Sequence, residues 1–102
     1  MTVRYERTGP VVVVTIDRPE RRNAIDRATA EGLYRAWRDF DADPEARVGV
    51  LTGVHGVFCA GADLVAFNLE ETAEGWLGIC RMSVSKPTIA AVAGPCVAGG
   101  LE

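Results

Sequence analysis

The chain has 102 residues, of which 48% are hydrophobic and 25% are charged, and its formal net charge is −3. This length suffices for one small domain, and the composition is ordinary for a globular protein. The acidic balance argues against a nucleic-acid partner, and no apolar run approaches the ~20 residues that span a bilayer. Because residues 1–6 are charged and alternating rather than typical of a secretory signal, we predict a soluble, cytoplasmic protein with no membrane partner.

A β-hairpin is predicted at the start of the chain. Residues 3–7 alternate in polarity, as an exposed edge strand does, and a turn follows at 8–10. Residues 11–16 are all β-branched, which is typical of a strand covered on both faces. Pro19 then ends the strand within a polar loop at 17–23.

The next predicted elements are a helix and a second buried strand. Asp26 is a good N-cap, and apolar side chains follow it at helical spacing, which predicts a helix over about 27–40. Within this stripe, Tyr34 and Trp37 are interpreted as core residues rather than as a ligand-binding box. Residues 48–52 are the predicted strand, and a glycine-rich loop follows at 53–62.

Another helix and another strand are predicted in the last third of the chain. Ala73, Trp76, Leu77 and Cys80 form a stripe that indicates a helix over about 70–83. A third buried strand is predicted at 88–93, and residues 98–100 are expected to open a further helix. This order of elements, with strands that are apolar on both faces, predicts an α/β fold with a parallel buried sheet.

Cysteine and histidine chemistry is not indicated. The three cysteines, Cys59, Cys80 and Cys96, are odd in number and lack C-x-x-C spacing, so we interpret them as small buried side chains in a reducing compartment. The single histidine, His55, is predicted to lie on a surface loop, which leaves no Ser-His-Asp set. No metal site is expected.

Two turns of small residues, 58–64 and 94–102, each follow a predicted strand. Small side chains let a ligand lie against backbone N–H groups, and two such donors can stabilise one oxyanion, such as a thioester enolate. A helix that starts after Gly99 would add its positive dipole end. The spacing fits neither G-x-G-x-x-G nor a P-loop. From these residues alone, an oxyanion-hole enzyme and an ordinary pair of strand-to-helix turns both remain open.

Residues 58–64 and 86–102, together with the stretch from Asp17-Arg18-Pro19 to Asn23-Ala24-Ile25-Asp26, resemble the enoyl-CoA hydratase/isomerase (crotonase) family. The resemblance covers essentially the whole chain. It implies a right-handed spiral of strand-strand-helix turns, of which residues 1–102 would be the N-terminal part. The C-terminal part and the trimerisation helices would lie outside it, in a full-length homotrimer or dimer of trimers.

The resemblance also implies a site for an acyl-CoA thioester. The N–H groups of Ala62 and Gly99 would form the oxyanion hole, and Glu102 matches one of two glutamates that handle water and proton in hydratases. The second glutamate lies further along in the family. The residues expected near coenzyme A are Arg22, Ala24, Ala60, Ala62, Asp63, Leu64 and Gly99.

The expected reaction is the addition of water to a trans-2-enoyl-CoA, with coenzyme A as part of the substrate and no tightly bound cofactor. Double-bond isomerisation, which needs one base and the same hole, is the alternative within the family. An inert fragment that only binds CoA, or a nucleotide-binding module, would be of another class. From its position alone, Asp63 is interpreted as a turn cap rather than as a catalytic carboxylate, and Lys86 is assigned no chemistry.

Overall fold

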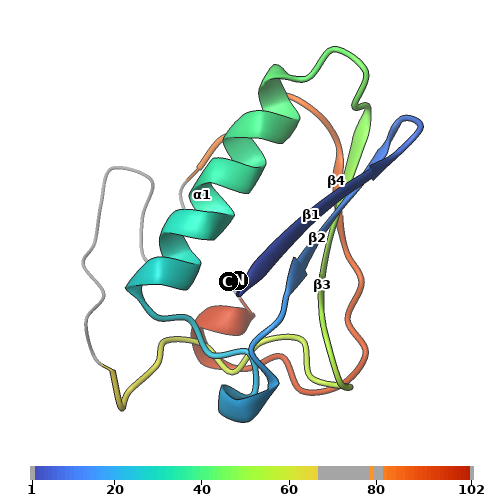
Figure 1. Cartoon of the computed structure of the whole chain (residues 1–102). Helices are drawn as coiled ribbons and strands as arrows, with labels where there is room; N and C mark the ends of the chain where they lie inside the picture. Colours follow the sequence, from blue (N-terminus) through green and yellow to red (C-terminus); the bar gives the residue numbers. More distant parts are fainter. Residues whose placement is uncertain (1, 67–78, 80–81, 102) are drawn as a thin grey trace.

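The computed structural model describes residues 2–66, 79 and 82–101. The elements run in the order β1 (Val3–Thr8), β2 (Val11–Ile16), the 3-10 turn η1 (Pro19–Arg21), α1 (Arg27–Ala42), β3 (Val48–Gly53), β4 (Thr88–Ala90) and the 3-10 turn η3 (Ala98–Gly100). The strands form one sheet in the order β1-β2-β3-β4, and α1 lies along one face of it (Figure 1). This α/β arrangement agrees with the predicted fold class.

The strand pairing follows the sequence pattern. β1 and β2 form an antiparallel hairpin, in which Thr8 faces Val11 across a turn that contains Gly9 with a φ of 59°. β2 pairs with β3, and β3 with β4, both in parallel. Consequently the carboxyl ends of β2, β3 and β4 lie at the same end of the sheet, and the three segments that leave them start there.

Helix α1 has the predicted cap and the predicted buried face. The Asp26 carboxylate accepts a hydrogen bond from the Thr29 N–H at 2.9 Å, which satisfies one of the free donors of the first turn. The helix continues two residues beyond the predicted end at 40, and its last turn is held by Lys86. The Lys86 Nζ donates to the Phe40 carbonyl at 2.8 Å, so this lysine caps α1, from which it is remote in sequence.

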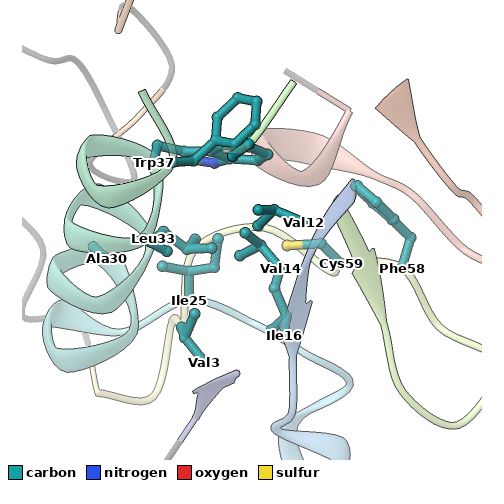
Figure 2. Packing of buried hydrophobic residues seen from close by; sticks show 13 residues of the cluster. Val3, Val12, Val14, Ile16, Ile25, Ala30, Leu33, Trp37, Phe58 and Cys59 are labelled. Atoms are coloured by element: carbon teal, nitrogen blue, oxygen red, sulfur yellow. The ribbon is translucent and has the colours of Figure 1, made fainter. Parts of the chain in front are cut away.

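The core lies between α1 and the sheet (Figure 2). Leu33 and Phe40 of the helix are fully buried, as are Val12 and Val14 of β2. The Trp37 and Phe40 rings meet edge to face, with their centroids 5.5 Å apart. Gly49 of β3 makes room for them, because a Cβ added there would lie 2.6 Å from the Trp37 Cζ3 atom.

Two predictions about the last third need correction. The strand predicted to be buried at 88–93 covers only Thr88–Ala90 and is exposed, with Ile89 at 56%. β4 lies at one edge of the sheet, and a run of apolar residues does not reveal whether another element covers such a strand. Residues 98–100 form one 3-10 turn where a helix start was expected.

The predicted second helix can be compared with the structure only at its end. Residues 67–78, 80 and 81, which include its apolar stripe, lie outside the described residues. Residues 82 and 83, its predicted end, are not helical.

Candidate active site

Three loops meet where β2, β3 and β4 end. Two isolated parallel bridges hold them together, one between Ile25 and Ala62 and the other between Cys59 and Cys96. The loop that follows β3 therefore lies between the loop after β2 and the segment after β4. This arrangement brings together the two small-residue turns, which are more than 30 residues apart in the chain.

The turns are in close backbone contact. The Val97 N–H donates to the Cys59 carbonyl at 3.2 Å. A Cβ on Gly61 would lie 3.0 Å from the Gly99 nitrogen, and one on Gly100 would collide with the Cys59 carbonyl. Gly61 also has a φ of 93°, which L-residues rarely adopt. The sequence predicts that these small residues admit a ligand, whereas in the structure Gly61 and Gly100 make room for the opposing turn.

Two backbone donors remain unused at this contact. Within the described part of the chain, neither the Ala62 N–H nor the Gly99 N–H donates a hydrogen bond. Their neighbours do: the Asp63 N–H donates to the Ile25 carbonyl at 2.9 Å, and the Gly100 N–H to the Val97 carbonyl at 2.8 Å. Both unpaired donors belong to partly buried residues on adjacent turns, an arrangement that can accept an anion or a polarised carbonyl.

The backbone around each donor is constrained. The Gly61 carbonyl accepts from the Ile25 N–H at 2.7 Å, and it belongs to the same peptide unit as the Ala62 N–H. Because that unit is planar and trans, the Ala62 N–H points away from Ile25. On the other turn, Ala98 precedes Gly99 with a φ of 51°, a left-handed conformation that is uncommon for alanine.

An apolar cavity of about 300 Å³ adjoins the turns. Gly99 and Gly100 line it on the side of the η3 turn, and Cys59 and Cys96 line it at the bridge. Core residues such as Leu33 of α1 and Phe58 form another part of its wall, and the exposed Val92 and Leu101 also line it. Such a cavity suits an apolar chain rather than a charged group.

Asp63 directly follows one unpaired donor, but its carboxylate faces protein groups. Its Oδ1 accepts from the N–H groups of Val65 at 2.9 Å and Ala66 at 3.0 Å, and its Oδ2 accepts from the Arg18 Nη1 at 2.7 Å. The hydrogen bond from the Ala66 backbone, followed by that from Arg18, lowers the pKa of Asp63 to about 2. The predicted capping role is confirmed, and at neutral pH this ionised group has no proton to give.

The other predicted site residues differ in exposure. Arg22 is exposed at the end of η1, and Leu64 is 77% exposed. Ala60 is partly buried, whereas Ala24 is 8% exposed and both its backbone groups are hydrogen-bonded, the N–H to Arg21 and the carbonyl to Arg18. Their roles toward a ligand remain predictions.

Glu102 lies outside the described residues, and so does Cys80. Of the other two cysteines, Cys59 is buried and Cys96 is partly buried. His55 is exposed in a turn, as predicted. No helix among the described residues is long and apolar enough to cross a membrane.

Sequence reasoning did not identify two residues that order the site. Asn23 is fully buried: its Oδ1 accepts from the Arg18 N–H at 2.9 Å, and its Nδ2 donates to the carbonyls of Val54 at 3.1 Å and Val57 at 2.7 Å. The Arg18 guanidinium contacts both Asp63 and Asp26. The only sequence signal was the family-like stretch that contains both residues, and local polarity had suggested an ordinary loop.

Comparison with known proteins shows the family of the chain. The sequence profile described as enoyl-CoA hydratase/isomerase matches residues 6–102. A mevalonyl-coenzyme A hydratase of Aspergillus fumigatus is 43% identical over 93% of this chain and 38% of its own length. An enoyl-CoA hydratase of Mycobacterium tuberculosis is 39% identical over 95% of this chain and 41% of its own length.

Solved structures give the same result. A probable enoyl-CoA hydratase/isomerase from Mycobacterium abscessus superposes with a TM-score of 0.91 at 40% identity, over 97% of this chain and 40% of that one. A carnitinyl-CoA dehydratase from Mycobacterium avium superposes with a TM-score of 0.89 at 46% identity, over the same shares of the two chains. The fold is therefore that of CoA-thioester enzymes. The chain belongs to the enoyl-CoA hydratase/isomerase family, and it spans about two fifths of the length of these relatives.

Proposed function

We propose that the protein processes acyl-CoA thioesters and that its reaction is the addition of water to a trans-2-enoyl-CoA. The observation that carries this proposal is the pair of unpaired N–H groups, at Ala62 and Gly99, on two turns in backbone contact. Residues 1–102 would be the N-terminal part of a crotonase-like domain, with its remainder and its trimerisation helices elsewhere. The complete protein would then be a homotrimer or a dimer of trimers.

In the proposed mechanism, the thioester carbonyl oxygen accepts hydrogen bonds from Ala62 and Gly99. Attack of water at C3 moves the electrons of the C2–C3 double bond onto that oxygen, which becomes an enolate. The two donors stabilise this charge more than that of the ground-state carbonyl, which lowers the barrier. The enolate then takes up a proton at C2 and the carbonyl re-forms. Glu102 and a second carboxylate are together assigned two tasks, which are to accept the proton that the attacking water loses and to give one proton to C2.

The contacts with the acyl chain and with coenzyme A are proposed from the positions of the residues around the two turns. The apolar cavity beside Gly99 is proposed to receive the acyl chain, because none of the side chains that line it is charged. The exposed Arg22 and Leu64 and the backbone around Ala60 and Asp63 are proposed to contact coenzyme A. Ala24 would contribute packing only, since its N–H and carbonyl already have protein partners.

Hydration of crotonyl-CoA by the complete natural polypeptide that carries residues 1–102 tests the reaction, with a parallel assay on a 3-enoyl-CoA. If the protein removes the conjugated double bond of crotonyl-CoA faster than it turns over the 3-enoyl-CoA, the result supports a hydratase. Turnover of the 3-enoyl substrate alone would instead identify an isomerase with the same hole. Binding of CoA without turnover of either thioester would contradict both.

The Gly99→Pro variant tests the oxyanion donor. Proline has no N–H, and within the described residues that N–H has no protein partner to lose. We expect kcat for crotonyl-CoA to fall by about two to three orders of magnitude. The matched control is Gly99→Ala, which adds a side chain but keeps the N–H. Equal losses in the two variants would contradict the proposed role of the donor.

A further inference from the structure

The Arg18 side chain joins the two loops that meet at Ala62. Its Nη1 donates to the Asp63 Oδ2 at 2.7 Å and to the Ala24 carbonyl at 2.8 Å, and its Nη2 lies 3.3 Å from the Asp26 Oδ2. The side chain is 11% exposed, and that of Asp63 is 4% exposed. These contacts differ from the other ion pairs of the described residues, such as Arg4–Asp17, whose side chains are 48% and 33% exposed.

These contacts surround the peptide that carries the Ala62 N–H. On one side of Ala62, the Gly61 carbonyl is held by the Ile25 N–H; on the other, the Asp63 N–H is held by the Ile25 carbonyl. Ile25 itself lies between Ala24 and Asp26, both of which bind the Arg18 guanidinium. The direction of the Ala62 N–H therefore depends on the bridge between Ile25 and Ala62. The Arg18 side chain connects the two segments that form this bridge.

We propose that Arg18 is a positioning residue for the proposed oxyanion donor at Ala62. This inference rests on the proposed function and adds to it a group that never touches the substrate. Arginine suits the task because its planar fork can reach two carboxylates and a carbonyl at once, whereas the three donors of a lysine ammonium all lie on a single nitrogen. Without Arg18, Asp63 would keep a buried charge with no cation, and its turn would have to shift to reach water.

The test uses Arg18→Met in the complete natural polypeptide, with Arg18→Lys as the charge-conserving variant and Arg4→Met as the matched control. The first readout is the split between kcat and KM for crotonyl-CoA. We expect kcat to fall about 100-fold in Arg18→Met, as for a reacting group misplaced by about 1 Å, while KM changes little. Arg18→Lys should restore only part of kcat, and Arg4→Met should behave as the parent protein.

The second readout is the infrared stretching frequency of the thioester carbonyl in the bound ligand. Hydrogen bonds from the oxyanion hole lower this frequency, and a loss of stability alone does not change it in the folded fraction. We expect a smaller lowering in Arg18→Met. Asp63→Asn, which keeps the shape but removes the charge, should reproduce the effect, and it keeps the test decisive if Arg18→Met does not fold.

The outcomes separate the two proposals. If the parent protein turns over crotonyl-CoA and lowers the carbonyl frequency, and the Arg18 and Asp63 variants retain both properties, the positioning role is wrong and the function stands. If the parent protein neither turns over an enoyl-CoA nor perturbs its carbonyl, both proposals fail. A fall in kcat with an unchanged carbonyl frequency would also contradict the positioning role.

Discussion

Asp63 shows how the setting of a single carboxylate determines its task. It is adjacent in sequence to a proposed catalytic donor, yet its two oxygens accept from Arg18 and from two backbone N–H groups. These donors stabilise the ionised form, so the pKa of Asp63 lies at about 2 rather than at the ordinary value of 3.8. The ionised Asp63 carboxylate therefore has a structural role, which is to bind Arg18 and the N–H groups of its own turn.

This pKa predicts a pH dependence of stability. Because the folded-state pKa is lower than the unfolded one, the unfolded chain binds more protons in acid, and the contribution of Asp63 is lost as pH falls from about 4 to about 2. The free energy of unfolding, measured in urea across this range, should therefore decline less steeply for Asp63→Asn than for the parent. Parallel curves would show that Asp63 makes no such contribution.

At the level of elements, the close packing of α1 on the sheet depends on one position, Gly49. Gly49 lies on β3 beneath the edge-to-face pair of Trp37 and Phe40. An added methyl group there would lie 2.6 Å from the Trp37 ring and 3.1 Å from the Phe40 ring. The helix can approach this strand closely only because residue 49 has no side chain.

We expect Gly49→Ala to lower the free energy of unfolding by about 1–3 kcal/mol, since two packed rings must shift. Thermal unfolding of the complete polypeptide measures this loss. The double variant Gly49→Ala/Trp37→Leu provides the control: if the ring is the obstacle, the two effects are not additive, and the double variant is more stable than the sum of the single losses predicts. If the two effects are strictly additive, the contact between residue 49 and the Trp37 ring is not the cause of the loss of stability.

For the molecule as a whole, the described residues leave the outer side of β4 and several apolar side chains uncovered. β4 pairs with β3 along one side only. The exposed large apolar residues beyond β3 are between 50% and 77% accessible: Leu64, Val65, Ile89, Val92, Val97 and Leu101. Open strand edges and apolar patches of this kind promote association.

We therefore predict that residues 1–102, expressed alone, self-associate at micromolar concentration. Sedimentation velocity would detect the larger species. Replacing Ile89 and Leu101 by glutamine should reduce association if these residues form the contact. A monomeric sample with one cooperative thermal transition would contradict the prediction.

Much of the fold was accessible from local patterns. The alternation before residue 8, the β-branched run at 11–16 and the Asp26 cap predicted β1, β2 and α1 close to their observed bounds. These signals are local because each depends on backbone propensity or on side-chain spacing within one element. The same reasoning misjudged Thr88–Ala90, since its burial depends on what lies beside the sheet and not on its own residues.

The sequence by itself determined β1, β2, α1 and β3, the two small-residue turns and the family-like pattern that pointed to a thioester site. Only the tertiary structure decided that Gly61 and Gly100 serve the contact between the turns, and that Arg18 binds a carboxylate 45 positions away. The physical reason is that parallel strands bring their carboxyl ends to the same end of the sheet, so residues remote in sequence become neighbours there. No local pattern encodes which of them will meet.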